Sequence, residues 1–265
     1  MSAHPSMRIG RANAMQGFSL IELMVALVVG LVVSGAVLAF TLASMKSNSE
    51  YILSTRLTQE LRNTMDLMTR DLRRAGYDET ALKYVATGNA TPFSRMQLCN
   101  SSGACSTVAT KLATGTVSCA IYAYDRENGN AGTVDLDNGE VRGIRLKSRS
   151  YGGRTVGVVE YAVSAGTLPT CSDAASPDYT TYPPSCSGGW CALSDPAKLD
   201  ITKLEINDNG TVVGTSPTQV QIRDLTINLT GRLAGSTEFT RQITSDVRTR
   251  SDCFDATISN CALAP

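Results

Sequence analysis

The sequence predicts an α+β protein, in which a long N-terminal hydrophobic and amphipathic α-helix packs on an antiparallel β-sheet head. Three observations support this class. An apolar run begins at Phe18 and reaches Ala43 with few polar interruptions. A helical apolar repeat follows it to about Ala75. Beyond Tyr77 the residues favour strands and turns, and all eight cysteines lie in that part of the chain.

The apolar run is long enough to cross a membrane. At ~1.5 Å per residue, a helix from Phe18 to Ala43 exceeds the ~30 Å hydrocarbon core of a bilayer. Arg8 and Arg11 precede it without an acidic residue, which predicts a cytoplasmic N-terminus by the positive-inside rule. A secretory signal peptide has its apolar core before the cut, whereas this apolar segment follows a short polar leader and would remain in the mature protein.

After Lys46 the pattern becomes amphipathic. Apolar side chains recur at spacings of three and four, which predicts one apolar stripe on a helix that ends near Gly76. The stripe consists of Leu53, Leu57, Leu61, Met65, Met68 and Leu72. Because this stripe would otherwise face water, we expect the sheet of the head to pack on it.

Strand signals follow in the head. Four segments alternate apolar and polar residues or are apolar for a few positions: Thr116–Tyr124, Val141–Lys147, Thr155–Ser164 and Leu199–Ile206. Gln219–Leu229 and Glu238–Val247 are predicted to form a long antiparallel hairpin with Gly231–Ser236 between them. A phase slip near Arg223–Asp224 indicates a bulge. Residues 165–198 are rich in Pro, Ser, Gly and Cys and are expected to form a surface loop.

Composition argues against catalysis. The only histidine, His4, lies before Gly17, so the rest of the chain offers no Ser-His-Asp or Cys-His mechanism and no imidazole for zinc. A membrane-anchored enzyme would have to use a Lys or carboxylate base. Without Arg8 and Arg11 there are 22 basic against 24 acidic residues, which does not indicate nucleic-acid binding. We expect no enzyme activity, no catalytic residues and no cofactor.

The cysteines predict disulfides. Their even number, confined to the part beyond the apolar helix, is typical of an oxidising periplasm. They fall into three groups: Cys99, Cys105 and Cys119; Cys171, Cys186 and Cys191; Cys253 and Cys261. The last two are the favoured pair, and one bridge is expected to join the first group to the second because both are odd. A structural zinc site is the alternative, but no C-x-x-C spacing is present.

A turn-rich acidic stretch is a weak calcium candidate. Asp125, Asp135 and Asp137 lie among further acidic and amide side chains, which supply the hard oxygen ligands that calcium prefers. Asp135–Gly139 is similar to the start of an EF-hand loop but lacks its later spacing. Solvated hairpin loops have the same composition, so an ordinary loop is the competing interpretation and no metal is assigned.

The junction Gly17-Phe18-Ser19-Leu20-Ile21-Glu22 resembles the prepilin leader of type IV pilins and type II secretion pseudopilins. The resemblance implies cleavage after Gly17 by prepilin peptidase, N-methylation of Phe18 and a role for Glu22 in subunit assembly. It divides the chain into a leader (1–17), a transmembrane and filament-core helix (18–43), an amphipathic stalk helix (44–76) and a disulfide-bonded periplasmic head (77–265).

Glu22 has two interpretations. A carboxylate in an apolar helix costs ~2.5–3.5 kcal/mol on insertion scales, less near an interface. Ser19 and Glu22 have capping-box spacing, so Glu22 could satisfy free N–H groups at the helix start. The resemblance implies instead that Glu22 neutralises the N-terminal amine of a neighbouring subunit, and the two roles are compatible.

A second resemblance concerns the subgroup. Met68–Tyr77, with its "DLRRAGY" end, and the late Val247–Arg250 are similar to segments of PilW-type minor pilins. This implies a low-abundance subunit that primes assembly with other minor pilins and the major pilin, serves adhesion and twitching motility, and belongs to a complex on which a large tip adhesin can be displayed. It would lie in the inner membrane before assembly and at the pilus tip afterwards. The alternative is a J-type pseudopilin of type II secretion.

Overall fold

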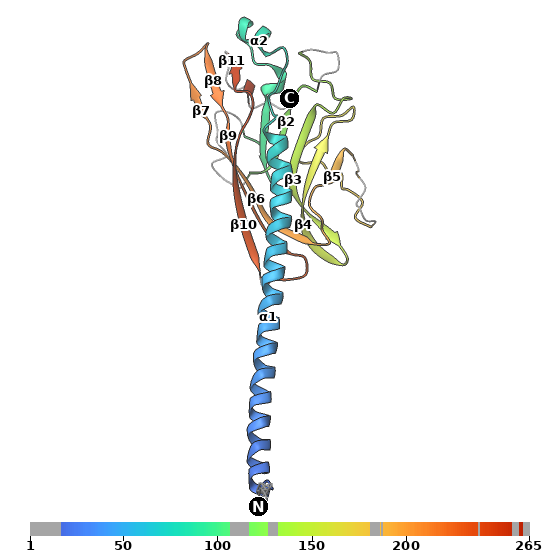
Figure 1. Cartoon of the computed structure of the whole chain (residues 1–265). Helices are drawn as coiled ribbons and strands as arrows, with labels where there is room; N and C mark the ends of the chain where they lie inside the picture. Colours follow the sequence, from blue (N-terminus) through green and yellow to red (C-terminus); the bar gives the residue numbers. More distant parts are fainter. Residues whose placement is uncertain are drawn as a thin grey trace, which may run out of the picture. The chain divides into compact units, whose positions relative to one another are not determined.

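The computed structural model describes residues 17–106, 117–126, 132–180, 186, 188–237, 239–255 and 260–261 (Figure 1). The predicted leader therefore lies outside the described residues, except for Gly17. The chain divides into two units, Met1–Ile52 and Leu53–Pro265, and each is described by itself. In the first unit the described residues form the start of α1 (Leu20–Leu72).

Helix α1 is shorter at both ends than the predicted Phe18–Ala75 segment. At its C-terminal end Arg73–Gly76 form a turn, in which the Ala75 N–H bonds to the Leu72 carbonyl at 3.1 Å. Gly76 follows with φ of 82°, the left-handed conformation that favours glycine, and its N–H bonds to Ala123 of the sheet at 2.8 Å. The predicted stop at Gly76 is therefore made by a backbone bond to the head.

The second half of α1 packs on strands through the predicted stripe. Leu57, Leu61, Met65, Met68 and Leu72 are all at most 4% exposed, in one core with residues of two sheets. Leu53 is the exception, at 38% exposure. The predicted packing of an antiparallel sheet on the amphipathic helix is confirmed, because helix and sheet each bury an apolar face against the other.

The first sheet has five antiparallel strands in the order β1-β2-β3-β4-β5. They are β1 (Met96–Asn100), β2 (Val117–Ala123), β3 (Val141–Tyr151), β4 (Arg154–Val163) and β5 (Trp190–Ala192). Before them lie α2 (Ala81–Thr87) and the short 3-10 helix η1 (Pro92–Ser94). The predicted strands at 116–124, 141–147 and 155–164 are confirmed, and β3 and β4 extend as one hairpin around Gly152 and Gly153.

Residues 165–198 are more than the predicted surface loop. They contain β5, which pairs with β4, and the fully buried Trp190. Trp190 belongs to a second apolar core on the other face of the first sheet, with Phe93, Ile121 and Ala162. The segment therefore covers a sheet face that would otherwise be exposed to water, which the low periodicity of its sequence does not indicate.

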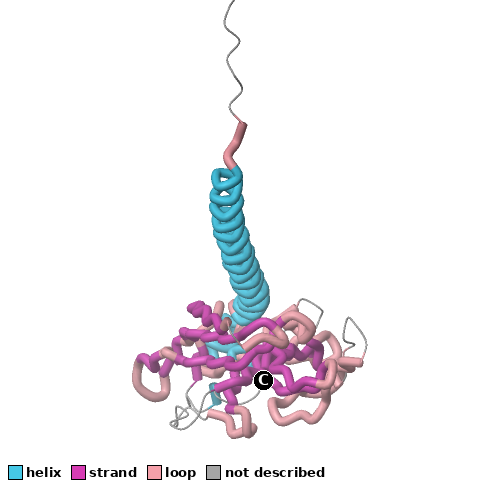
Figure 2. Tube along the Cα trace, turned by 90° about the horizontal axis from the view of Figure 1, so that it is seen from below, coloured by secondary structure: helices cyan, strands magenta, loops and turns pink. Residues whose placement is uncertain are grey.

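The late strands form two three-stranded sheets, β10-β9-β6 and β11-β8-β7. They are β6 (Leu199–Asp208), β7 (Thr211–Val213), β8 (Gln219–Ile222), β9 (Asp224–Leu233), β10 (Thr240–Arg248) and β11 (Cys253–Asp255). Figure 2 shows that strands predominate in the head.

The predicted hairpin of 219–229 with 238–247 is correct only for its second half, because β9 pairs with β10 whereas β8 pairs with β7 and β11. The predicted bulge is a complete break at Arg223, whose side chain is 3% exposed and donates to the Cys261 carbonyl. β9 also continues to Leu233, through part of the predicted connecting loop.

Candidate assembly site

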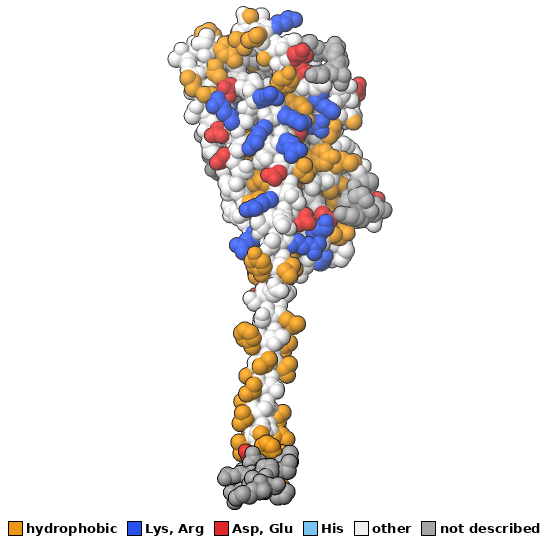
Figure 3. Space-filling view, in the orientation of Figure 1, with side chains coloured by type: hydrophobic (Ala, Val, Ile, Leu, Met, Phe, Trp, Pro, Cys, Tyr) orange, Lys and Arg blue, Asp and Glu red, His pale blue; other side chains and the backbone are white. Residues whose placement is uncertain are grey.

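The described part of the first unit has an apolar surface on all sides. Residues 17–49 are all exposed, and the most apolar window of α1 has a mean hydropathy of 2.7 with none of its residues buried. Figure 3 shows the hydrophobic side chains along this segment. Such a helix is long and apolar enough to cross a membrane, and it requires lipid or other apolar helices around it.

Glu22 lies in the first turn of this helix and is the only acidic residue among residues 18–49. The backbone N–H of Leu23 bonds to the Ser19 carbonyl at 3.1 Å. Among the residues that the structure describes, neither the Ser19 hydroxyl nor the Glu22 carboxylate makes a side-chain hydrogen bond. The carboxylate is exposed and available to a partner molecule.

Gly17 and Phe18 precede the helix. Phe18 is 84% exposed, and a Cβ placed on Gly17 would meet no atom within 4 Å. Nothing in the described structure therefore requires glycine at position 17. A requirement for glycine there would come from a molecule that acts on this peptide bond.

The end of α1 is fastened to the head through Asp71. Its carboxylate accepts hydrogen bonds from the hydroxyls of Tyr122 at 2.5 Å and Tyr124 at 3.0 Å. Burial, and then the Asp71 charge, raise the pKa of both tyrosines, so both remain neutral donors. The exposed basic side chains Arg70, Arg73 and Arg74 lie on the outer side of the helix, where Figure 3 shows a group of basic residues.

The two segments on which the subgroup prediction rests, Met68–Tyr77 and Val247–Arg250, meet in space. The guanidinium of Arg250 lies over the Tyr77 ring at 5.3 Å from its centroid, and a Cβ on Gly76 would lie 3.1 Å from Ser251. Val247 and Leu72 are both fully buried in the same core. Each segment therefore has a structural role in fixing the helix end to the last long strand.

All eight cysteines are paired. The bridges are Cys99–Cys105, Cys119–Cys171, Cys186–Cys191 and Cys253–Cys261. The last is the favoured pair, and Cys119–Cys171 is the expected connection between the first two groups. It ties the segment that covers the first sheet to β2.

Two of the three calcium candidates, Asp125 and Asp135, accept hydrogen bonds from other residues of the head. Asp125 accepts from the Glu79 N–H at 3.2 Å. The Asp135 carboxylate accepts from the Asp137 N–H and the Asn138 amide, both at 2.8 Å. Within the described residues no three His, Cys, Asp or Glu side chains form a group that could hold a metal ion. Residues 127–131 of this acidic stretch lie outside the described residues.

Two family models match the chain. One, described as the prokaryotic N-terminal methylation motif, covers residues 13–38 and includes Gly17, Phe18 and Glu22. The other, described as prepilin peptidase-dependent protein B, covers residues 50–249, from the second half of α1 through β10. The chain belongs to the prepilin peptidase-dependent protein B family. It is a pilin-like protein with an N-methylation motif, and no curated protein and no solved structure matches it.

A buried charged cluster in the head of this family member was not predicted from the sequence. Glu160 on β4 is fully buried and accepts hydrogen bonds from Arg145 and Arg149 of β3. The signal was present in the sequence, because basic residues occupy alternate positions 145, 147 and 149 and therefore share one face of a strand.

Proposed function

We propose that this protein is a minor pilin of the type IV pilus, of the PilW type, which primes pilus assembly and occupies the tip complex. Prepilin peptidase cleaves it after Gly17, and Phe18 becomes the methylated N-terminus. The observation that carries the proposal is the unshielded apolar helix of residues 20–49 with a single carboxylate at Glu22. This helix serves first as a membrane anchor and then as a core element of the filament.

The disulfides support an exported head. Four bridges are typical of an oxidising compartment, which supports a head in the periplasm while α1 is anchored in the inner membrane. The role is structural and not catalytic, since the mature chain has no histidine to act as a general base or a zinc ligand. Other minor pilins, the major pilin and a tip adhesin are the proposed partners.

Glu22 acts at assembly. Its replacement by Ala removes a charge that is costly in lipid, so membrane insertion is unharmed. In the filament, however, the Phe18 amine of a neighbouring subunit loses its counter-ion in a low-dielectric bundle. Because a priming subunit starts filaments, we expect fewer pili rather than shorter pili.

The test expresses Glu22→Ala as the only copy and counts surface pili after confirming cleavage and membrane association. Glu50→Ala, the next acidic residue along the chain, is the matched control and should leave pilus number unchanged.

Gly17→Val should leave an uncleaved precursor in the membrane without disturbing the fold. Wild-type pilus numbers with the Glu22→Ala protein present in them would contradict the assembly role. Lost secretion with normal pili would indicate the J-type pseudopilin alternative.

A further inference from the structure

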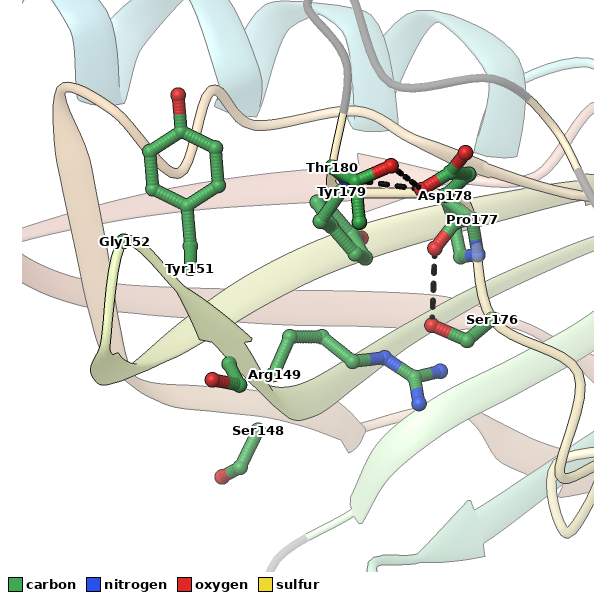
Figure 4. Close-up of a pocket in the computed structure, with 10 residues that line it drawn as sticks. Ser148, Arg149, Tyr151, Gly152, Ser176, Pro177, Asp178, Tyr179 and Thr180 are labelled. Atoms are coloured by element: carbon green, nitrogen blue, oxygen red, sulfur yellow. Dashed lines mark hydrogen bonds between the residues drawn. The ribbon is translucent and has the colours of Figure 1, made fainter.

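A preformed groove lies on the head, between the β3–β4 hairpin and the segment before β5. Its volume is about 800 Å³, and it is open to solvent on one side. One wall is formed by residues 148–152 of the hairpin and the other by residues 176–180. Figure 4 shows Tyr151 rising from the hairpin on one side, Tyr179 and Thr180 on the other, and the Arg149 side chain below Tyr179, extending toward Ser176.

Buried polar contacts hold the two walls in place. Glu160 is fully buried and accepts from Arg145 at 2.9 Å, from Arg149 at 2.6 and 3.0 Å, and from the Tyr179 hydroxyl at 3.0 Å. The same two arginines donate to the Ala175 carbonyl, at 2.6 and 3.1 Å. Because these contacts are made without a ligand, binding in the groove costs little ordering of the protein.

The segment that forms the second wall is also anchored by residues that precede it in the sequence. The Cys119–Cys171 bridge attaches it to β2. Asp173 accepts from the Trp190 indole at 3.2 Å, and the Arg145 guanidinium lies 3.7 Å from the Trp190 ring centroid. The groove is therefore part of a fixed framework that extends into the second core of the head.

The charges around the groove balance. Among the residues that line the groove, Arg149 is the only cation and Asp178 the only carboxylate. Arg149 and Glu160 neutralise each other directly, and Asp178 lines the open rim. A strongly anionic ligand would meet the Asp178 carboxylate, and a cationic one would meet Arg149.

The rim offers donors, acceptors and an aromatic ring. The Tyr151 hydroxyl makes no hydrogen bond to any described residue, and its ring is half-buried. One oxygen of Asp178 accepts from the Thr180 N–H at 2.8 Å and from its hydroxyl at 2.6 Å, which leaves the other oxygen open to solvent. Ser176, at the inner end, has a hydroxyl oxygen that can still accept while it donates to the Pro177 carbonyl.

We infer that this groove binds a neutral oligosaccharide. A sugar hydroxyl both donates and accepts, which fits a rim of hydroxyls with one charged acceptor. The C–H face of a sugar ring is apolar and stacks on an aromatic ring such as that of Tyr151. Because the charges of the groove lining balance, the groove favours an uncharged oligosaccharide over a sulfated or uronic one. The inference does not rest on the proposed role in assembly, because the groove lies entirely within the head.

The experiment uses the full chain in a detergent that has no sugar headgroup. The probes are immobilised neutral hexasaccharides of glucose, galactose, mannose and N-acetylglucosamine, with sulfated and uronic hexasaccharides as charged probes. At least one neutral probe should bind, and no charged probe should bind more tightly. Tyr151→Ala should weaken binding about tenfold, since lost ring stacking and area correspond to roughly 1.4 kcal/mol. Tyr151→Phe should retain most of the affinity.

Two controls keep the result specific to the groove. Tyr51→Ala makes the same substitution at an exposed residue outside the head and should not change binding. Trp190 fluorescence should be unchanged in Tyr151→Ala and Asp178→Asn, which shows that the framework is intact. Failure of every neutral probe, preference for charged probes, or binding that survives both Tyr151→Ala and Asp178→Asn would each overturn the inference.

Discussion

Asp173 connects the segment before β5 with the buried indole of Trp190. Burial raises the pKa of its carboxyl, but hydrogen bonds from the Thr170 hydroxyl and N–H and from Trp190 outweigh burial, so the pKa is lowered from its usual value of 3.8. A carboxyl whose pKa is lower in the folded state stabilises the fold above its unfolded pKa. That contribution is lost as the pH falls through the folded pKa.

Acid should therefore release this segment at a pH below 3.8. Trp190 is the only tryptophan, so its emission reports the loss of the Asp173 contact and of the Arg145 stacking. We expect an emission change in a fluorescence titration of the wild type at that pH. In Asp173→Asn, which has no titrating group at this position, the change should be absent or already present at neutral pH. The same acid transition in the variant would show that another group controls it.

The pairing of the cysteines shows why residue-scale contacts could not be predicted from the sequence. Cys99 and Cys119 are direct register partners on β1 and β2, yet Cys99 bonds to Cys105 and Cys119 bonds to Cys171. The Asp71 and Glu160 contacts likewise depend on which strand face turns inward. The residues at the N-terminal junction, in contrast, form a continuous motif, and the motif match covers them without any long-range pairing.

At the scale of elements, the contact of α1 with the sheets depends on its apolar stripe. Leu61 is fully buried, and its side chain lies against Gly231 of β9. Leu61→Ala should reduce the free energy of unfolding by about 2–5 kcal/mol, measured by denaturant titration, because it leaves a cavity between helix and sheet. Leu67→Ala, at a leucine that is 47% exposed on the same helix, should change it by about 0.5 kcal/mol or less. Similar losses in both variants would contradict the packing.

Gly157 of β4 in the first sheet lies directly against β6 of the β10-β9-β6 sheet. Its N–H bonds to the Asp200 carboxylate at 2.8 Å, and a Cβ there would lie 1.9 Å from the Ile201 carbonyl oxygen. Because backbone on β6 cannot yield as a side chain can, Gly157→Ala should cost about 1–3 kcal/mol or more of unfolding free energy. Thr155→Ala, at an exposed position of the same strand, is the control. A melting curve equal to that of the wild type would show that the sheets can separate.

Periodicity explains which elements could be predicted. The stripe on α1 and the strands of the first sheet follow local patterns of 3.6 and 2 residues, so the sequence alone identifies them. The break between β8 and β9 at Arg223 follows no local pattern, because the Arg223 guanidinium turns inward to bond to the carbonyl of Cys261, 38 residues later. β5 is too short for a pattern, and it exists because Trp190 fills the second core.

For the whole molecule, the four bridges predict how many reactive thiols the protein has before and after reduction. The unfolded full chain should show no reactive thiol before reduction and eight after it. Reduction should destabilise the head by about 2–4 kcal/mol for each structural bridge and leave residues 20–49 helical, since they contain no cysteine. Thiol titration in guanidinium and circular dichroism measure the two effects. Two or more thiols before reduction would contradict full pairing.

The groove on the head exists only in the folded molecule, because it forms where two distant segments of the chain come together. For this reason it was not predicted from the sequence. Its walls come from residues 148–152 and 176–180, which the sequence separates and the buried Glu160 joins. Tyr151 and Asp178 are unremarkable in the sequence, because neither belongs to a motif.

The C-terminal tail completes the smallest sheet. β8 is the middle strand between β7 and β11, and β11 is held by Cys253–Cys261 while Arg223 bonds to the Cys261 carbonyl. A chain that stopped after Arg248 would leave β8 with an open edge and a buried guanidinium without its acceptor, both of which favour aggregation and proteolysis. Residues 253–261 thus decide whether the middle strand of the smallest sheet of the head has two protected edges or one that is open to other chains.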